Sequence, residues 1–237
     1  MRIISIGDLV TDFYYKNGKL IGVNGGMTSH NIIANIAKLG LETGAYGVCG
    51  NDTAGNIAIK SLRDIGVNVD NIRIFDNLST RCFHVSYFEK NGKLEFKLKK
   101  RCPVCNEKNW YAESKIEPND ILKHINNNDV LIFDNLNKKN QIIIDNCDNG
   151  KMLDLGQCFE LENYSDNDIV EKIKNNFDFI NLNERVEKYL KNRFSINFLE
   201  DIYNLLQPKM IIVTRGKKVQ ILFLITIKWV KSCVILR

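Results

Sequence analysis

Short apolar runs recur along this chain, each ending in a polar residue or Gly, and stretches with helical spacing lie between them. The runs are "RIISIGD", "TGAYGVCG", "DVLIFDN", "KMLDLGQ", "FDFINLN" and "KMIIVTRG". A continuous apolar run of this length is typical of a strand that is buried on both faces. Strands that alternate with helices indicate a mostly parallel sheet with helices on both faces. The sequence therefore predicts an α/β fold.

Two segments do not fit that alternation. Asn17-Gly18 lies within "DFYYKNGKLIGV", and Asn91-Gly92 lies within "STRCFHVSYFEKNGKLEFKLKK". An Asn-Gly pair between strand-like runs is a strong hairpin signal. We expect lid hairpins at about residues 10–23 and 80–100, which would form a small antiparallel sheet beside the main one.

Composition and charge narrow the class of function. A length of 237 residues suits one large α/β domain. The net charge of +5 comes from residues 217–237, which hold five basic and no acidic residues, so the remainder is balanced. We therefore expect no nucleic-acid partner and no membrane partner. The chain opens directly with a strand, and "VQILFLITI" is too short to span a bilayer, so we expect a cytoplasmic protein with reduced thiols.

Ligands of open α/β sheets bind at the carboxyl ends of the strands. The candidates at such ends are Asp8, Asp12, Gly25, Gly26, Asp134, Asp154, Asn183, Thr214 and Gly216. The glycine pair permits close approach of a ligand to the backbone. A carboxylate at Asp12 and a carboxamide at Asn31 can together bind several hydroxyls, as in a sugar. The alternative is an ordinary turn followed by a helix cap, with Thr28 or Ser29 as the capping residue and Gly40 as the helix stop.

Three linked stretches resemble the PfkB/ribokinase family of sugar and nucleoside kinases. They are "GDLVTD", "NGGMTSHNIIANIAKLG" and "GVCGNDTAGNIAIKSLRDIGV". The residues that match in order and spacing are Gly25, Gly26, Asn31, Gly40, Gly50, Asp52, Gly55, Gly66 and Val67. The small residue that the family places two positions after the Asn is Ile33 here. The resemblance implies a ribokinase-like fold over residues 1–218, about two-thirds to three-quarters of such a kinase.

The family phosphorylates a sugar hydroxyl with ATP and Mg²⁺, and the resemblance implies the same reaction here. The residues that would hold a small-molecule sugar are Asp12, Gly25, Gly26 and Asn31. The residues that would face the nucleotide are Asn183, Thr214 and Gly216. Thr80-Arg81 opens the second lid hairpin, where family members often touch substrate. Lid hairpins in this family often pair between subunits, which implies a homodimer.

The metal assignment is divided between two registers. The family has a Glu three positions after the Asn, which holds magnesium through water. Counted from Asn183, that position is Val186; counted from Asn181, it is Glu184. Glu184 is therefore the candidate metal residue, and Glu187 also lies nearby.

The pattern stops near Lys218. The family continues to a "GAGD" motif, whose backbone N–H groups form an anion hole and whose Asp is the general base. Residues 217–237 contain no Gly and no Asp. The atypical tail 219–237 is either an authentic terminus with an extra strand or the product of a reading-frame change. We expect these 237 residues to be catalytically inactive. The alternative is a non-catalytic sugar-binding or regulatory remnant.

Cys102 and Cys105 have zinc-knuckle spacing. No second CxxC or CxxH follows at finger distance, so ordinary thiols in a turn are the simpler interpretation. A zinc-binding interaction module remains the third hypothesis, to be tested by elemental analysis.

Overall fold

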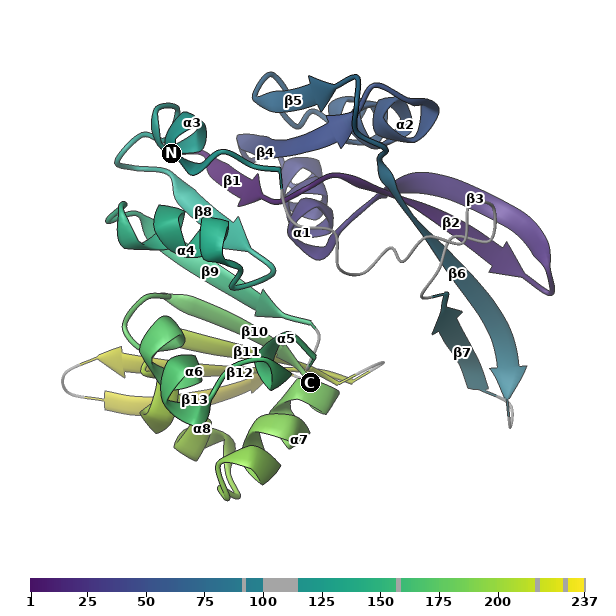
Figure 1. Cartoon of the computed structure of the whole chain (residues 1–237). Coiled ribbons are helices and arrows are strands. Elements are labelled where there is room, and N and C mark those ends of the chain that lie inside the picture. The colour runs from purple at the N-terminus through teal and green to yellow at the C-terminus, as the bar shows by residue number, and fades with distance from the viewer. Residues whose placement is uncertain (91–92, 100–114, 157–158, 216–217, 228–229, 237) are drawn as a thin grey trace. The chain divides into compact units, whose positions relative to one another are not determined.

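The computed structural model describes residues 1–90, 93–99, 115–156, 159–215, 218–227 and 230–236. At residues 93–94, 159–160, 215, 218–227 and 230–236 this description covers the backbone. The chain divides into two compact units (Figure 1). The first unit comprises residues 2–117, and the second comprises residues 118–237 together with Met1. The predicted zinc ligands Cys102 and Cys105 and the predicted nucleotide residue Gly216 lie outside the described residues.

The first unit contains three parallel strands in the order β1-β4-β5. These strands are β1 (Ile3–Ile6), β4 (Thr43–Gly50) and β5 (Ile72–Phe75). Strand β4 is buried at every position, as its uninterrupted run of small and apolar residues predicts. Helix α1 (Thr28–Lys38) packs on β1 and β4, and helix α2 (Thr53–Arg63) packs on β2, β3 and β4. Their apolar stripes supply the core of this unit.

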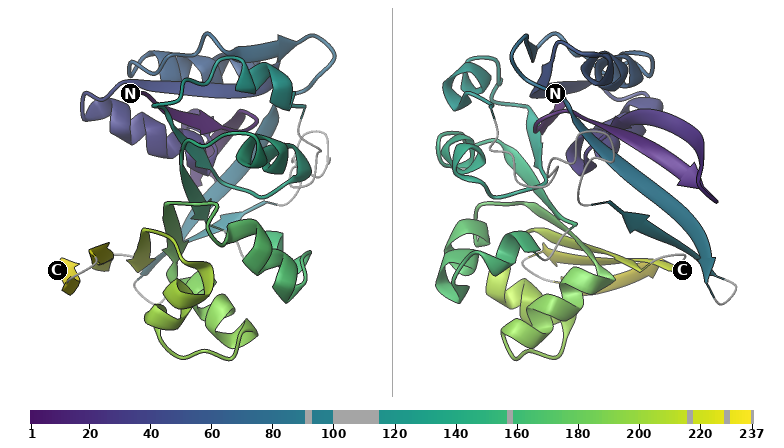
Figure 2. Two further views of the ribbon diagram at one scale, coloured as in Figure 1. Left: turned by 90° about the vertical axis from the view of Figure 1, so that its left-hand side faces the viewer. Right: turned by 45° about the vertical axis from the view of Figure 1, so that its right-hand side comes forward.

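The predicted lid is a four-stranded sheet in the order β3-β2-β6-β7. Its strands are β2 (Val10–Lys16), β3 (Lys19–Gly26), β6 (Arg81–Lys90) and β7 (Lys93–Leu98). Both hairpins are antiparallel as predicted, and Asn17 and Gly18 have the positive φ that their turn requires. The expectation of a purely antiparallel sheet is corrected, because β2 pairs with β6 in parallel. The long connection through β4, α2 and β5 brings β6 back in the direction of β2. Figures 1 and 2 show these strands extending beyond α1 and α2.

Of the two predicted ends of α1, the C-terminal one is confirmed and the N-terminal one is wrong. Gly40 follows the helix at φ +83°, which confirms it as the stop. Neither Thr28 nor Ser29 is the N-cap; that position is Met27, at φ 85°, with no side-chain cap hydrogen bond. Ser29 is instead buried inside the first turn. Met27 thus holds a backbone conformation that a side chain disfavours, directly after the glycine pair.

The second unit contains four parallel strands in the order β8-β9-β10-β11. These strands are β8 (Val130–Phe133), β9 (Gly150–Leu155), β10 (Phe179–Asn183) and β11 (Met210–Arg215). The helices are α3 (Pro118–Leu122), α4 (Lys138–Asp145), α5 (Phe159–Glu162), α6 (Asp166–Ile173), α7 (Glu184–Arg193) and α8 (Leu199–Leu206). The predicted alternation of strands and helices is confirmed. The chain continues into an antiparallel hairpin, β12 (Lys218–Ile227) and β13 (Val230–Leu236), which pairs with β11. Both interpretations of the tail stay predictions.

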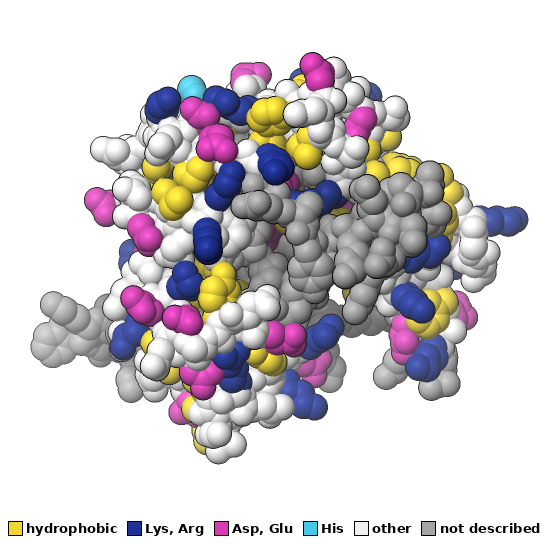
Figure 3. All heavy atoms as spheres, viewed as in Figure 1, with side chains coloured by type: hydrophobic (Ala, Val, Ile, Leu, Met, Phe, Trp, Pro, Cys, Tyr) yellow, Lys and Arg dark blue, Asp and Glu magenta, His cyan; other side chains and the backbone are white. Residues whose placement is uncertain are grey.

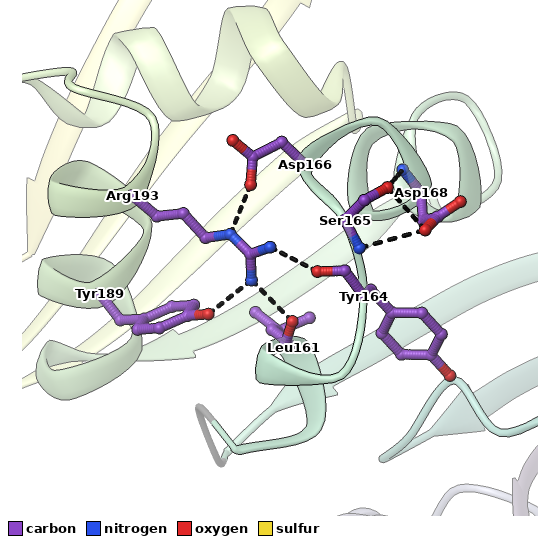
Figure 4. A network of polar contacts seen from close by, with 7 residues as sticks. All are labelled: Leu161, Tyr164, Ser165, Asp166, Asp168, Tyr189 and Arg193. Atoms are coloured by element: carbon purple, nitrogen blue, oxygen red, sulfur yellow. Dashed lines mark hydrogen bonds and ion pairs between the residues drawn. The ribbon is translucent and has the colours of Figure 1, made fainter.

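One guanidinium group fastens the end of α7 to the α5–α6 region (Figure 4). Arg193 donates through Nε to Asp166 Oδ1 at 2.6 Å and through one terminal nitrogen to Leu161 O at 2.7 Å and to Tyr189 Oη at 2.6 Å. Its other terminal nitrogen donates to Tyr164 O. The planar fork of Arg can serve four acceptors at once, which the single ammonium of Lys cannot.

Three glycines in the first unit allow backbone segments to approach closely. A Cβ on Gly47 would lie 2.0 Å from Gly7 O, and one on Gly50 would lie 2.0 Å from Leu78 O. A Cβ on Gly55 would lie 2.2 Å from Gly50 O. None of these glycines has positive φ, so each is needed for space, and a side chain would push strands or the helix apart.

We predict that Gly47→Ala destabilises the protein by about 3 kcal/mol or more, because the new methyl group collides with a backbone carbonyl. Gly44→Ala on the same strand is the control, since its Cβ would meet Asn68 O at an ordinary 3.8 Å. We expect the control to change the free energy of unfolding in urea by about 1 kcal/mol or less. Equal effects of the two substitutions would contradict the steric argument.

Arg193→Lys should cost about 1–3 kcal/mol, because at least one buried carbonyl loses its donor. Arg185→Lys makes the same chemical change on the same helix at an exposed position and should stay within about 0.5 kcal/mol of wild type. Urea midpoints of the two variants give the comparison. An unchanged midpoint for Arg193→Lys would show that the network adds nothing to stability.

Candidate functional site

The Asp12 carboxyl group lies against the backbone of Gly26. A Cβ on Gly26 would sit 2.4–2.5 Å from Cγ and both oxygens of Asp12. Any larger residue at position 26 would therefore displace the carboxylate. Tyr14 Oη donates to Asp12 Oδ2 at 3.1 Å. Burial raises the pKa of Asp12, and the Tyr14 hydrogen bond opposes that rise.

Gly25 and Asn31 have different surroundings. A Cβ on Gly25 would lie 3.0 Å from Ala58 O, and Gly25 N donates to Ser61 Oγ at 2.9 Å. The small size of Gly25 thus serves the packing of β3 on helix α2. Asn31 is exposed in the first turn of α1. The first unit therefore contains all four sugar candidates on β2, β3 and the start of α1, and their role in binding stays a prediction.

His30 and Asp8 make contacts at and just after the end of β1. His30 is buried, with Nδ1 2.7 Å from Ser5 Oγ and Nε2 3.2 Å from Gly7 O. A carbonyl can only accept, so Nε2 carries the proton and Nδ1 accepts from Ser5. Asp8 is paired with Arg81 at 3.0 Å, and both side chains are largely buried. Arg81 thus contacts Asp8, which holds the start of β6 near the end of β1.

The motif residues after β4 connect three segments. Asp52 caps α2 by accepting from Gly55 N at 2.7 Å, and its other oxygen accepts from Thr80 N at 2.8 Å. Thr80 Oγ1 accepts from Gly50 N at 2.8 Å. Although partial burial alone would raise it, the pKa of Asp52 is lowered by these backbone hydrogen bonds. Gly50, Asp52 and Gly55 therefore act on the fold by placing the start of β6.

A buried acid–amide pair lies at the carboxyl ends of β9 and β10. Asn181 Nδ2 donates to Asp154 Oδ1 at 2.7 Å, across neighbouring strands. Burial raises the pKa of Asp154 to about 6, and the Asp134 carboxylate adds to the rise while the Asn181 hydrogen bond opposes it. Because Asn181 is bound to Asp154, the register that would pair it with Glu184 at a metal gains no support.

Asn183 and Thr214 are register partners on β10 and β11. Asn183 caps α7 by accepting from Val186 N at 2.9 Å, and it donates to Gly156 O at 2.7 Å. Thr214 Oγ1 lies 3.4 Å from Leu182 O. The structure brings this predicted nucleotide pair together, while both side chains bond to the protein. Glu184 begins α7 with an exposed side chain.

The structure gives no support to a magnesium site at Val186. Val186, at the position of the family's Glu, is fully buried in the core. Within the described parts of the chain, no three His, Cys, Asp or Glu side chains gather as a metal site would require.

Signs of a nucleic-acid or membrane partner would lie in the charged side chains and the helices, and neither shows one in the described residues. Basic and acidic side chains are interspersed on the face shown in Figure 3, with neither sign gathered over one element. Among the helices of the described residues, none has the length and apolarity that crossing a bilayer requires.

No family model matches the sequence. A curated relative, the bifunctional protein HldE of Sulfurimonas denitrificans, is 34% identical over 98 residues. That match covers 33% of this chain and 20% of the relative, so it spans about a fifth of the relative's length.

Solved structures similar to this one include sugar and nucleoside kinases. An uncharacterized sugar kinase from Pyrococcus horikoshii has a TM-score of 0.71 at 17% identity, over 100% of this chain and 76% of that one. The same kinase in complex with ATP has a TM-score of 0.66, over 99% and 75%. Adenosine kinase from Sinorhizobium meliloti has a TM-score of 0.68 at 14% identity, over 91% and 75%. The chain therefore has the ribokinase-like fold, which confirms the predicted fold class and the resemblance to the PfkB/ribokinase family at the level of fold.

Asp154→Asn should stabilise the protein at pH 7 by roughly 2–3 kcal/mol, from the difference between the raised pKa and that of an unfolded Asp. A raised pKa means that the folded state holds its proton more tightly than the unfolded state does. Wild-type stability therefore falls as pH rises from about 4 to about 6. The variant lacks this loss, so the two proteins should converge near pH 4.

Urea unfolding at several pH values between 4 and 7 measures the difference. Asp148→Asn, at an exposed position before β9, is the control and should shift stability by less than about 0.5 kcal/mol at every pH. A constant gap between Asp154→Asn and wild type across this range would contradict the raised pKa.

Proposed function

We propose that this chain, on its ribokinase-like fold, is a PfkB-type carbohydrate kinase polypeptide that binds a small sugar, in the family reaction of phosphoryl transfer from ATP. The observation that carries the proposal is the Asp12 carboxylate, half-buried against Gly26, with a glycine pair and Asn31 in the same unit. A partly desolvated carboxylate accepts strong hydrogen bonds from hydroxyls.

We propose ATP as the phosphoryl donor for two reasons. Asn183, Thr214 and Gly216 match the family's nucleotide residues by resemblance, and a similar sugar kinase has been solved in complex with ATP. A homodimer through the lid sheet rests on the same family resemblance. These 237 residues contain no GxGD motif. In phosphoryl transfer, positioning and charge stabilisation supply most of the catalysis. We therefore propose that these 237 residues turn the sugar over negligibly. The alternative is a non-catalytic sugar-binding or regulatory protein.

Asp12→Asn should weaken sugar binding about tenfold or more, because a hydrogen bond to a charged acceptor becomes a neutral one. Isothermal titration with D-ribose, D-fructose and D-mannose measures this. Asp64→Asn, on the exposed end of α2, is the matched control and should bind like wild type. Failure of every sugar to bind wild type would refute the proposal.

A coupled ADP-release assay with Mg·ATP tests turnover on the same sample. We expect a rate far below the roughly 1–100 s⁻¹ of working kinases. Turnover within that range would show that the missing motif is not needed. A thermal transition raised by sugar and not by ATP would favour the sugar-binding alternative.

A further inference from the structure

The face of the lid sheet that carries Asp12 also carries aromatic side chains. Asp12 and Tyr14 are two residues apart on β2, so both point to one face. Tyr14 stacks on Tyr87 of β6, with ring centroids 6.2 Å apart and planes inclined by 18°. Tyr87 therefore lies on the same face.

Phe13, Tyr15 and His84 occupy the opposite face. Phe13 stacks on His84 at 5.0 Å, and Tyr15 Oη lies 2.9 Å from His84 Nδ1. Helix α2 covers the base of that face, where Thr11 Oγ1 donates to Ala54 O at 2.6 Å. The face of Asp12 and Tyr14 is thus the one turned away from α2.

The ring of Tyr14 is held by its surroundings. Its cross-strand partner on β3 is Gly22, which leaves space beside the ring. The register of β2 and β3 shifts between Tyr14 and Tyr15, a bulge-type irregularity of the kind that redirects side chains. Together with the stack on Tyr87, these features set the direction of the phenol oxygen.

We propose that Tyr14 is a specificity-determining residue of the sugar site, which orients Asp12 and, with it, reads two neighbouring hydroxyls of the substrate. This inference rests on the proposed function. Tyr14 Oη and Asp12 Oδ2 lie 3.1 Å apart, about the separation of hydrogen-bonded oxygens. Neighbouring hydroxyl oxygens of a sugar have a similar spacing, so one hydroxyl donates to the carboxylate and the next donates to Oη.

The proton of Tyr14 is available for this role. Burial raises the pKa of Tyr14 well above its ordinary value, and the charge of the Asp12 carboxylate and its hydrogen bond to Tyr14 add to the rise. The phenol therefore remains a donor to the carboxylate at neutral pH. With its proton directed at Asp12, its lone pairs are left to accept from a ligand hydroxyl.

Tyr14→Phe is the test, and Tyr87→Phe is the matched control, because each removes one hydroxyl from the same stacked pair. The probes are D-ribose and D-mannose with their monodeoxy derivatives, titrated calorimetrically. We expect wild type to lose about tenfold in affinity when either of two neighbouring hydroxyls is removed. In Tyr14→Phe, removal of one of those two hydroxyls should cost less than about twofold, and Tyr87→Phe should behave as wild type.

A second measurement tests orientation without a ligand. The ¹³Cγ shift of Asp12, assigned with Asp12→Asn, is followed against pH. Loss of the Tyr14 hydrogen bond should raise the pKa of Asp12 further in Tyr14→Phe and leave it unchanged in Tyr87→Phe. A merely structural role of Tyr14 would not produce this difference.

The outcomes separate the two proposals. If wild type binds neither sugar, the proposed sugar site is wrong, and so is the proposal that Tyr14 and Asp12 bind two neighbouring hydroxyls. If wild type binds a sugar but Tyr14→Phe discriminates against every deoxy derivative as wild type does, only the proposal that Tyr14 binds a sugar hydroxyl is wrong. An unchanged Asp12 pKa in Tyr14→Phe would show that Tyr14 does not orient the carboxylate.

Discussion

The Asp52 carboxylate is the junction on which the first unit depends. One oxygen caps α2 at Gly55, and the other accepts from Thr80, whose hydroxyl in turn accepts from Gly50. Three chain segments therefore meet around one side chain. Thr80 is followed directly by β6, so this junction decides where β6 begins.

The position of β6 determines the rest of the candidate site. Arg81 pairs with Asp8, and β6 lies parallel to β2, with Phe83 opposite Asp12. The same strand supplies Tyr87, which stacks on Tyr14. Gly50, Asp52 and Gly55, which match the PfkB/ribokinase family in order and spacing, therefore act on Asp12 indirectly. They position strand β6, which pairs with the strand that carries Asp12. Gly26 then provides the space that the carboxylate needs.

The residues predicted to bind the sugar lie in the first unit and those predicted to face the nucleotide lie in the second, and their polar groups have different partners. Asp12 receives one hydrogen bond from Tyr14 and is half-buried, which suits a group that meets a ligand. The carboxamide of Asn183 accepts a hydrogen bond at the N-terminus of α7 and donates one to Gly156 O. Val186, which the register counted from Asn183 places at the family's Glu, has a buried apolar side chain. The role of Asp12 in sugar binding stays a prediction, and the buried side chain of Val186 gives a metal ion no ligand.

The sequence by itself determined the α/β class, the two hairpins and the six strands of the apolar runs, and it made Asp12 a candidate. Strand β5 lies outside those runs and was not predicted. Apolar runs, Asn-Gly turns and glycine stops are local signals, since each reflects the backbone preferences or burial of a few adjacent residues. The tertiary structure decided that β2 and β6 pair in parallel, that Met27 rather than Thr28 or Ser29 caps α1, and that Asn181 binds Asp154. It also decided that the Tyr14 hydroxyl donates a hydrogen bond to Asp12. The spacing of these two residues placed them on one face, but the stack on Tyr87 comes from a strand some seventy residues away, and no local pattern encodes such a contact.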